Sequence, residues 1–256
     1  MSLRTATTAL GIAIAACGTV LVAACGTVLV AACGTVLVAA CGSTGAEPFH
    51  YPLVATGAPA EAFAVGDWQV TLTRADVAVG PVYLCTTAAA SPDLCAVAIG
   101  EFTDIAVIDA LDPAAQPLGD IEARPGDVRS AMLDYGISWF TTQTSPAPLG
   151  DLEHSARITG TAVLGDMSLG FDATVDVTPP MRGSLALVGL HAVTDAPDED
   201  SRLELQVDVR GWLTSVDFDA LAQTGLTHTI VPGDDAHAAI AFAMTTHPPI
   251  FRWTHP

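Results

Sequence analysis

From residue 63 onward, short apolar segments alternate with turn residues, and this pattern constrains the fold more than any other feature of the chain. In the clearest segment, 202–210, leucine or valine occupies every second position from 203, with acidic or amide residues between them. Because successive side chains of a strand point to opposite faces of a sheet, this segment predicts a strand with one face in water. We therefore predict an all-β fold, an antiparallel β-sandwich over residues 63–256, with one or two short helices near the C-terminus.

Other segments of strand length fill most of this region. They are residues 68–74, 76–84, 96–99, 105–111, 155–164, 167–177, 184–193 and 250–253, and residues 127–140 predict a strand pair or one long bent strand. Helices are predicted at 216–223 and 236–247, the second because two aspartates precede it. The polar, proline-rich connector 141–152 is where we place any internal break. Trp212 follows Gly211 at the end of a predicted strand, so we expect it at the surface.

The first forty-one residues contain a perfect tandem repeat. The unit GTVLVAAC occurs at 18–25, 26–33 and 34–41, and a partial copy, AIAAC, ends at Cys17. Arg4 precedes a long apolar run, as in a secretory signal. Each copy ends in two small residues, cysteine and glycine, which resembles the lipobox of bacterial lipoprotein signal peptides. The resemblance implies cleavage before a cysteine, diacylglycerol on its thiol and acylation of the new amine.

Several cysteines could be the lipidated residue. We favour Cys25 or Cys41, with Cys17 as an alternative, and we interpret 1–41 as the signal peptide and 42–62 as a flexible tether. A membrane-spanning helix is the other interpretation, since residues 9–41 are long enough to cross a bilayer. No basic cluster follows this segment to favour that interpretation. By resemblance to Gram-negative lipoproteins, glycine after the cysteine implies the outer membrane of the cell envelope.

The net charge of the chain excludes one class of binding partner. The formal net charge is −19, and all nine basic residues are arginine. Such a surface repels phosphate backbones, so we predict no nucleic-acid partner. The predicted partners are a membrane, through the lipid anchor, and a protein or small-molecule ligand.

Two further cysteines lie outside the repeat. Cys85 and Cys95 bracket a short loop that contains the turn sequence Ser-Pro-Asp. An exported protein meets an oxidising compartment, so we predict a disulfide between them. Their spacing does not match the Cys-x-x-Cys pattern of redox motifs.

Metal binding is a second functional hypothesis. Four of the seven histidines fall in the last 29 residues. His228, His237 and His247 are candidates to hold copper or zinc, together with Met132, Met167 or Met244. No His-x-His or His-Glu-x-x-His pattern occurs, and folding would have to bring these residues together. We predict no cofactor, with a metal ion as the one alternative.

A third hypothesis is a secreted hydrolase that uses acidic residues. Glycosidase chemistry needs two carboxyl groups about 5–10 Å apart, and among 28 acidic residues the sequence nominates no pair. There is also no Gly-x-Ser-x-Gly motif. We therefore favour a binding or structural module over an enzyme.

One stretch resembles a known family. The run WQVTLTRADVAVGPVYL at 68–84, the Val-Ile-Asp strand at 107–109 and the turn Pro125-Gly126 are similar to the opening of the periplasmic copper- and methanobactin-binding β-sandwich family. The resemblance implies a β-sandwich in the periplasm. No ligand motif accompanies it, so no functional residue is carried over.

Overall fold

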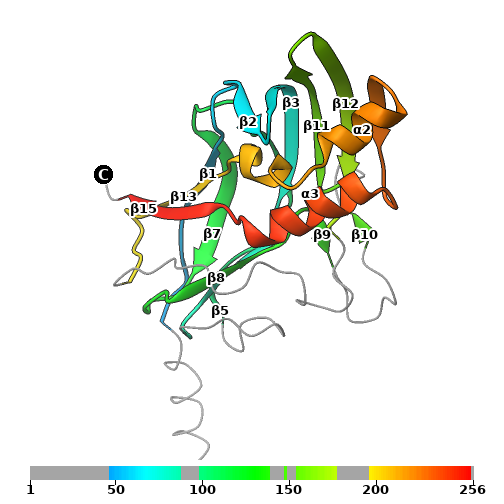
Figure 1. Cartoon of the computed structure of the whole chain (residues 1–256). Coiled ribbons are helices and arrows are strands. Elements are labelled where there is room, and N and C mark those ends of the chain that lie inside the picture. Colours follow the sequence, from blue (N-terminus) through cyan, green and yellow to red (C-terminus); the bar gives the residue numbers. More distant parts are fainter. Residues whose placement is uncertain (1–45, 88–97, 139–146, 149–153, 178–195, 255–256) are drawn as a thin grey trace, which may run out of the picture. The chain divides into compact units, whose positions relative to one another are not determined.

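The computed structural model of the protein describes residues 46–87, 98–138, 147–148, 154–177 and 196–254 (Figure 1). The chain divides into two units between Glu47 and Pro48, and the fold described here belongs to the second. The repeat segment with its candidate lipidation sites Cys17, Cys25 and Cys41 lies outside the described residues, as do the predicted strand 184–193 and most of the connector 141–152.

Two large sheets form the fold, so the predicted all-β sandwich is confirmed. The seven-stranded sheet has, in order, β15 (Ile250–Thr254), β13 (Arg202–Gln206), β1 (Phe49–Thr56), β7 (Gln116–Ala123), β5 (Ala98–Phe102), β4 (Val82–Cys85) and β8 (Ser130–Leu133). The six-stranded sheet has β14 (Thr227–Ile230), β12 (Met167–Val175), β11 (Ala156–Leu164), β3 (Trp68–Val79) and β2 (Phe63–Val65), with β6 (Ala106–Asp109) also paired to β3. A separate two-stranded sheet joins β9 (Ile137–Ser138) and β10 (Ala147–Pro148).

The predicted antiparallel pairing has two exceptions. β1 pairs with β13 in parallel, and β12 pairs with β14 in parallel, whereas the other named strand pairs are antiparallel. Parallel neighbours need a long crossover between them. Alternation of apolar and polar residues reports which face of a strand is buried, but it carries no information about strand direction.

The predicted tether contains a strand. β1 lies within 42–62 and pairs with β13 on one side and β7 on the other. Its buried residues Tyr51, Leu53 and Ala55 alternate with neighbours on the opposite face. Because the sequence on both sides of β1 is rich in glycine and proline, the whole segment indicates a tether and this short alternation does not stand out. The tether prediction is therefore wrong for Phe49–Thr56.

Strands β11 and β12 correspond to the predicted strands 155–164 and 167–177 and pair as a hairpin, in which one glycine is required by close packing. A Cβ atom on Gly160 would lie 2.6 Å from the Thr71 carbonyl oxygen and 2.8 Å from the Phe171 ring. The pairing of β11 with β3 shifts register at this point, between Thr159 and Gly160. Only glycine lets the backbone of β11 approach β3 this closely.

Three short helical segments follow β13. They are η1 (Val209–Leu213), α2 (Phe218–Thr224) and α3 (Asp235–Thr246). The two predicted helices correspond to α2 and α3, while η1 replaces the end of the predicted strand 202–210. Among the helices of the described residues, none combines the length and apolar character needed to cross a membrane.

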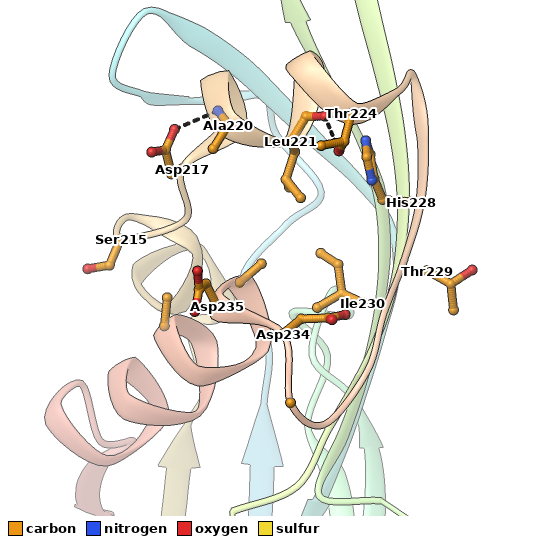
Figure 2. A pocket seen from close by; sticks show the side chains of 13 residues that line it. Ser215, Asp217, Ala220, Leu221, Thr224, His228, Thr229, Ile230, Asp234 and Asp235 are labelled. Atoms are coloured by element: carbon orange, nitrogen blue, oxygen red, sulfur yellow. Dashed lines mark hydrogen bonds between the residues drawn. The ribbon is translucent and has the colours of Figure 1, made fainter.

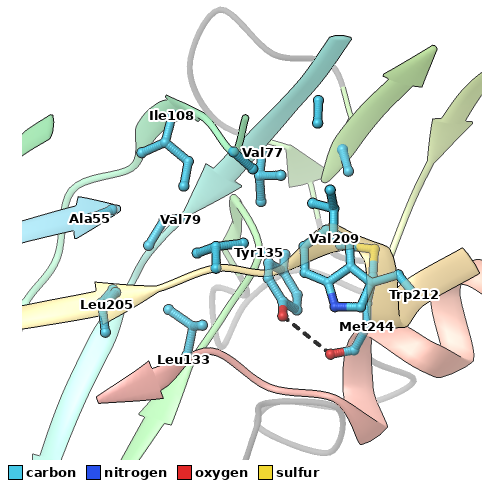
Figure 3. Close-up of a cluster of buried hydrophobic side chains, with 14 of the residues drawn as sticks. Ala55, Val77, Val79, Ile108, Leu133, Tyr135, Leu205, Val209, Trp212 and Met244 are labelled. Carbon is cyan, nitrogen blue, oxygen red and sulfur yellow. Dashed lines mark hydrogen bonds between the residues drawn. The ribbon is translucent and has the colours of Figure 1, made fainter. Parts of the chain in front are cut away.

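An aromatic cluster docks the last turn of α3 on the core (Figure 3). The Tyr135 hydroxyl donates to the Met244 carbonyl at 3.1 Å, and Trp212 Nε1 donates to the His247 carbonyl at 3.1 Å. The two rings meet edge to face with centroids 5.6 Å apart. Both donors satisfy carbonyls at the end of a helix, where no partner exists within the helix. Trp212 is only 1% exposed, so its predicted surface position is wrong.

Candidate functional site

A cavity of about 640 Å³ lies between α2, β14 and the first turn of α3 (Figure 2). Its polar lining residues are Ser215, Asp217, Thr224, His228, Thr229, Asp234 and Asp235. Its other lining residues are Ala220, Leu221, Ile230, Gly233, Ala236 and Ala239. We call this cavity the α2–α3 pocket.

At one end of the pocket, the residues that cap α2 form the lining. Asp217 is the N-cap residue, and its carboxylate accepts from the Ala220 backbone N–H at 2.9 Å. Gly225 is the C-cap residue of α2, and its carbonyl oxygen lies 2.9 Å from His228 Nε2. Because a carbonyl can only accept, Nε2 of His228 carries hydrogen and donates it. His228 is thereby held on β14 beside the pocket.

At the other end, the lining comes from the turn between β14 and α3. The Asp234 carboxylate accepts from the Val231 backbone N–H at 2.9 Å, and Gly233 in this turn has φ +106°. Asp235 opens the helix. In Figure 2 Asp234 and Asp235 lie below the cavity and Asp217 above it, so carboxylates border it at two ends.

The pocket has an unbalanced charge. Three aspartates line it, and its described lining residues include no arginine to neutralise them. The backbone donors that hold Asp217 and Asp234 orient their carboxylates without cancelling the negative charge. This arrangement attracts cations and repels anions. Leu221 and Ile230 add hydrocarbon surface to the lining.

A second cavity, of about 400 Å³, lies where β1 and β13 end, and it is balanced in charge. Arg210 donates from Nε and Nη2 to the two oxygens of Asp208, at 2.8 and 2.6 Å. This bidentate pairing lowers the pKa of Asp208 and leaves no uncompensated charge on the pair. His247 also lines this cavity.

The three candidate metal-binding histidines lie in three different places. His228 lines the α2–α3 pocket, His247 lines the second cavity, and His237 contacts the end of β12. Among the described residues, no group of three His, Cys, Asp or Glu side chains could hold a metal ion. Met132 and Met244 are fully buried. The described part of the fold therefore does not assemble these candidates into one centre.

His237 has a structural environment that spacing along the sequence does not reveal. It is 8% exposed, and its Nε2 accepts from the Asp176 backbone N–H at 3.1 Å. The Asp176 carboxylate in turn accepts from His154 Nδ1 at 3.0 Å. Burial lowers the pKa of His237, although the carboxylates of Asp176 and Asp234 partly oppose this shift. A bond to a backbone group leaves no signature in residue types.

The pocket also contains a serine, a histidine and an aspartate, the residue types of a hydrolytic triad, but the described hydrogen bonds do not link them as a triad requires. Ser215, His228 and Asp217 all line it. However, the hydrogen bonds of His228 and Asp217 described above go to the backbone rather than to one another. Nucleophilic catalysis needs a base bonded to the nucleophile and oriented by a third group. The observed hydrogen bonds support ligand binding better than this chemistry.

The predicted disulfide lies partly outside the described residues. Cys85 ends β4 and is fully buried, but Cys95 is not described. The pairing of Cys85 with Cys95 stays a prediction.

No protein-family model matches the chain, and no match is found among curated proteins. The structure resembles that of MbnP from Methylosinus trichosporium, with 12% sequence identity, a TM-score of 0.35 and coverage of 82% of this chain and 98% of that one.

Proposed function

We propose that this protein is a lipid-anchored binding protein of the cell envelope whose β-sandwich captures a small organic cation in the α2–α3 pocket. The observation that carries the proposal is the cavity with three aspartates and no arginine among its described lining residues. Its volume of about 640 Å³ falls in the range of pockets that hold small molecules.

The lining favours an organic cation over a bare metal ion. A metal ion needs several ligands converging on one point, and the described residues offer no such group. An alkylammonium ligand needs only dispersed negative charge and hydrocarbon contact. Asp217 and Asp235 supply the charge, and Leu221 and Ile230 supply the contact.

The anchor is supported by the sequence alone. The lipobox-like repeats place a lipidated cysteine, at Cys25, Cys41 or Cys17, before the first strand of the sandwich. Acyl chains contribute about 0.8 kcal/mol per buried methylene, so several chains would hold the protein on a membrane. By resemblance to Gram-negative lipoproteins, the glycine after each cysteine favours the outer membrane. A Cys85–Cys95 disulfide is consistent with an exported protein.

The proposal is tested by calorimetric titration of the full-length protein, in a neutral detergent, with spermidine and with citrate. We expect saturable binding of spermidine and none of citrate. Asp217→Asn with Asp235→Asn should weaken spermidine binding roughly tenfold, since each exposed charge pair contributes up to about 1 kcal/mol. Asparagine is also a good N-cap, so α2 keeps its cap in this variant.

The matched control removes two charges elsewhere. Asp120 and Asp166 are exposed and do not line the pocket. Asp120→Asn with Asp166→Asn changes the net charge by the same amount and should leave spermidine affinity within about twofold. Equal weakening by both double variants would mean that the cation binds the acidic surface in general, and the proposal would be wrong.

A further inference from the structure

The first turn of α3 contacts the pocket on one side and the end of β12 on the other. Asp235 and Ala236 line the α2–α3 pocket, whereas the next residue, His237, is buried and contacts the end of β12. The hydrogen bond from the Asp176 backbone N–H to His237 Nε2 therefore joins the acidic end of the pocket to the six-stranded sheet. We call this hydrogen bond the α3 latch.

The α3 latch requires a neutral imidazole. A backbone N–H can only donate, so His237 Nε2 must present a lone pair, and the ring hydrogen is on Nδ1. Protonation would place an N–H group on Nε2 against the N–H of Asp176, across a contact of 3.1 Å. Two donors cannot bond to each other, so the imidazolium breaks the latch.

The charged groups around His237 determine where its ring moves once it is protonated. The carboxylates of Asp176 and Asp234 attract an imidazolium, while His154 opposes it when charged. η1, which also packs against α3, brings Arg210, but this arginine is paired with Asp208. The new charge therefore draws the His237 ring away from the backbone of Asp176 and toward the two carboxylates.

We propose that His237 is a positioning residue: its neutral ring holds the first turn of α3 against β12 and fixes Asp234 and Asp235 in the pocket, and acid releases them. The inference rests on the proposed function, because it predicts that the pocket captures its cation near neutral pH and binds it less tightly in acid. Burial disfavours the imidazolium, so the change falls below the ordinary histidine range of about pH 6.5.

The first test needs no ligand. In the full-length protein, the Asp176 amide should be protected from hydrogen exchange at pH 7.5 and should be less protected at pH 5.5, together with the amides of the first turn of α3. In His237→Gln the side-chain oxygen can accept from the same N–H without titrating, so protection should persist at both pH values. Unchanged protection in the wild type would overturn the inference.

The second test uses spermidine as the probe. Wild-type affinity should fall roughly threefold to tenfold between pH 7.5 and pH 5.5, as expected for the loss of one hydrogen bond that positions the site. His237→Gln should remove this pH dependence. His228 lines the pocket itself, so His228→Gln, which keeps a side-chain N–H for Gly225, is the control and should retain the dependence.

The outcomes separate the two proposals. A pH dependence that disappears in His228→Gln and persists in His237→Gln would overturn the role of His237 while leaving cation binding intact. If spermidine binds at neither pH, the proposed function is wrong, and the exchange of the Asp176 amide alone decides whether the α3 latch responds to acid.

Discussion

The hydroxyl of Tyr135 donates a hydrogen bond to the main-chain carbonyl of Met244, 109 residues further along the chain, at 3.1 Å. This bond joins the segment after β8 to the last turn of α3, and both residues are buried. Burial also raises the pKa of Tyr135 well above its usual range, so the phenol stays a donor. The same fold contains a second buried tyrosine, Tyr51, whose hydroxyl has no hydrogen-bond partner among the described residues.

The two tyrosines make a matched pair for mutagenesis. Tyr135→Phe should lower the free energy of unfolding by about 1–2 kcal/mol, because it leaves the Met244 carbonyl without its partner. Tyr51→Phe removes a hydroxyl that already lacks a partner within the described chain and should be neutral or slightly stabilising. Urea denaturation of both variants measures the difference, and equal losses would contradict the assigned hydrogen bond.

Two strand glycines should respond differently to alanine. A Cβ on Gly160 would meet the Thr71 carbonyl oxygen at 2.6 Å, whereas one on Gly170 would find its nearest neighbour, the Leu226 carbonyl oxygen, at 4.0 Å. Gly160→Ala should therefore cost about 1–3 kcal/mol of stability, and Gly170→Ala less than about 0.5 kcal/mol. Thermal unfolding tests this, and a tolerated Gly160→Ala would contradict the close approach of β11 to β3.

Stability should depend on pH through His237. Its pKa is lower in the folded protein than in the unfolded chain, so the unfolded chain takes up a proton first as the pH falls. The stabilisation is complete above about pH 6.5 and is lost progressively below it. Urea midpoints at pH 7.5, 6.5 and 5.5 should show a smaller decline for His237→Gln than for the wild type. Identical declines would assign the pH effect to other groups.

The sequence predicts those strands whose alternation is long and whose flanks are clear. β11, β12 and β13 are of this kind. β3 is one strand, Trp68–Val79, where the prediction has a break at 75 and joins the end of β3 to β4 in 76–84. β7 is missed because its buried side chains are few, chiefly Ile121 and Ala123, and Gly119 interrupts them. β14 is missed because Thr227–Ile230 is short and buries only Ile230. In both strands pairing with neighbours, rather than local pattern, determines the structure.

The candidate pocket could be predicted only in part. The aspartates that precede α3 are readable from the sequence, whereas Asp217, the N-cap of α2, falls inside the predicted helix 216–223 rather than at its start. Their convergence is not readable, because it depends on β14 lying parallel to β12. The α3 latch is still harder to predict from the sequence, because its donor is the backbone N–H of Asp176 and its acceptor, His237, is 61 residues away.

Membrane attachment is tested on the protein made in a Gram-negative host. We expect the mature N-terminal peptide to carry an acylated, diacylglycerol-modified cysteine at position 25, 41 or 17. Replacement of all four repeat cysteines, Cys17, Cys25, Cys33 and Cys41, by serine should move the protein from the detergent-rich to the aqueous phase on phase separation. Mass spectrometry that found an unmodified Met1, or lipid on Cys33 alone, would contradict the assignment.

Location of the bound cation tests the central claim most directly. Amide chemical shifts of the full-length protein are followed while spermidine is added at neutral pH and about 0.15 M salt, which screens weak surface attraction. The account predicts saturable shifts that concentrate at Asp217, His228 and Asp235. Shifts that spread over the acidic surface and do not saturate, or that leave these three amides unchanged, would contradict it.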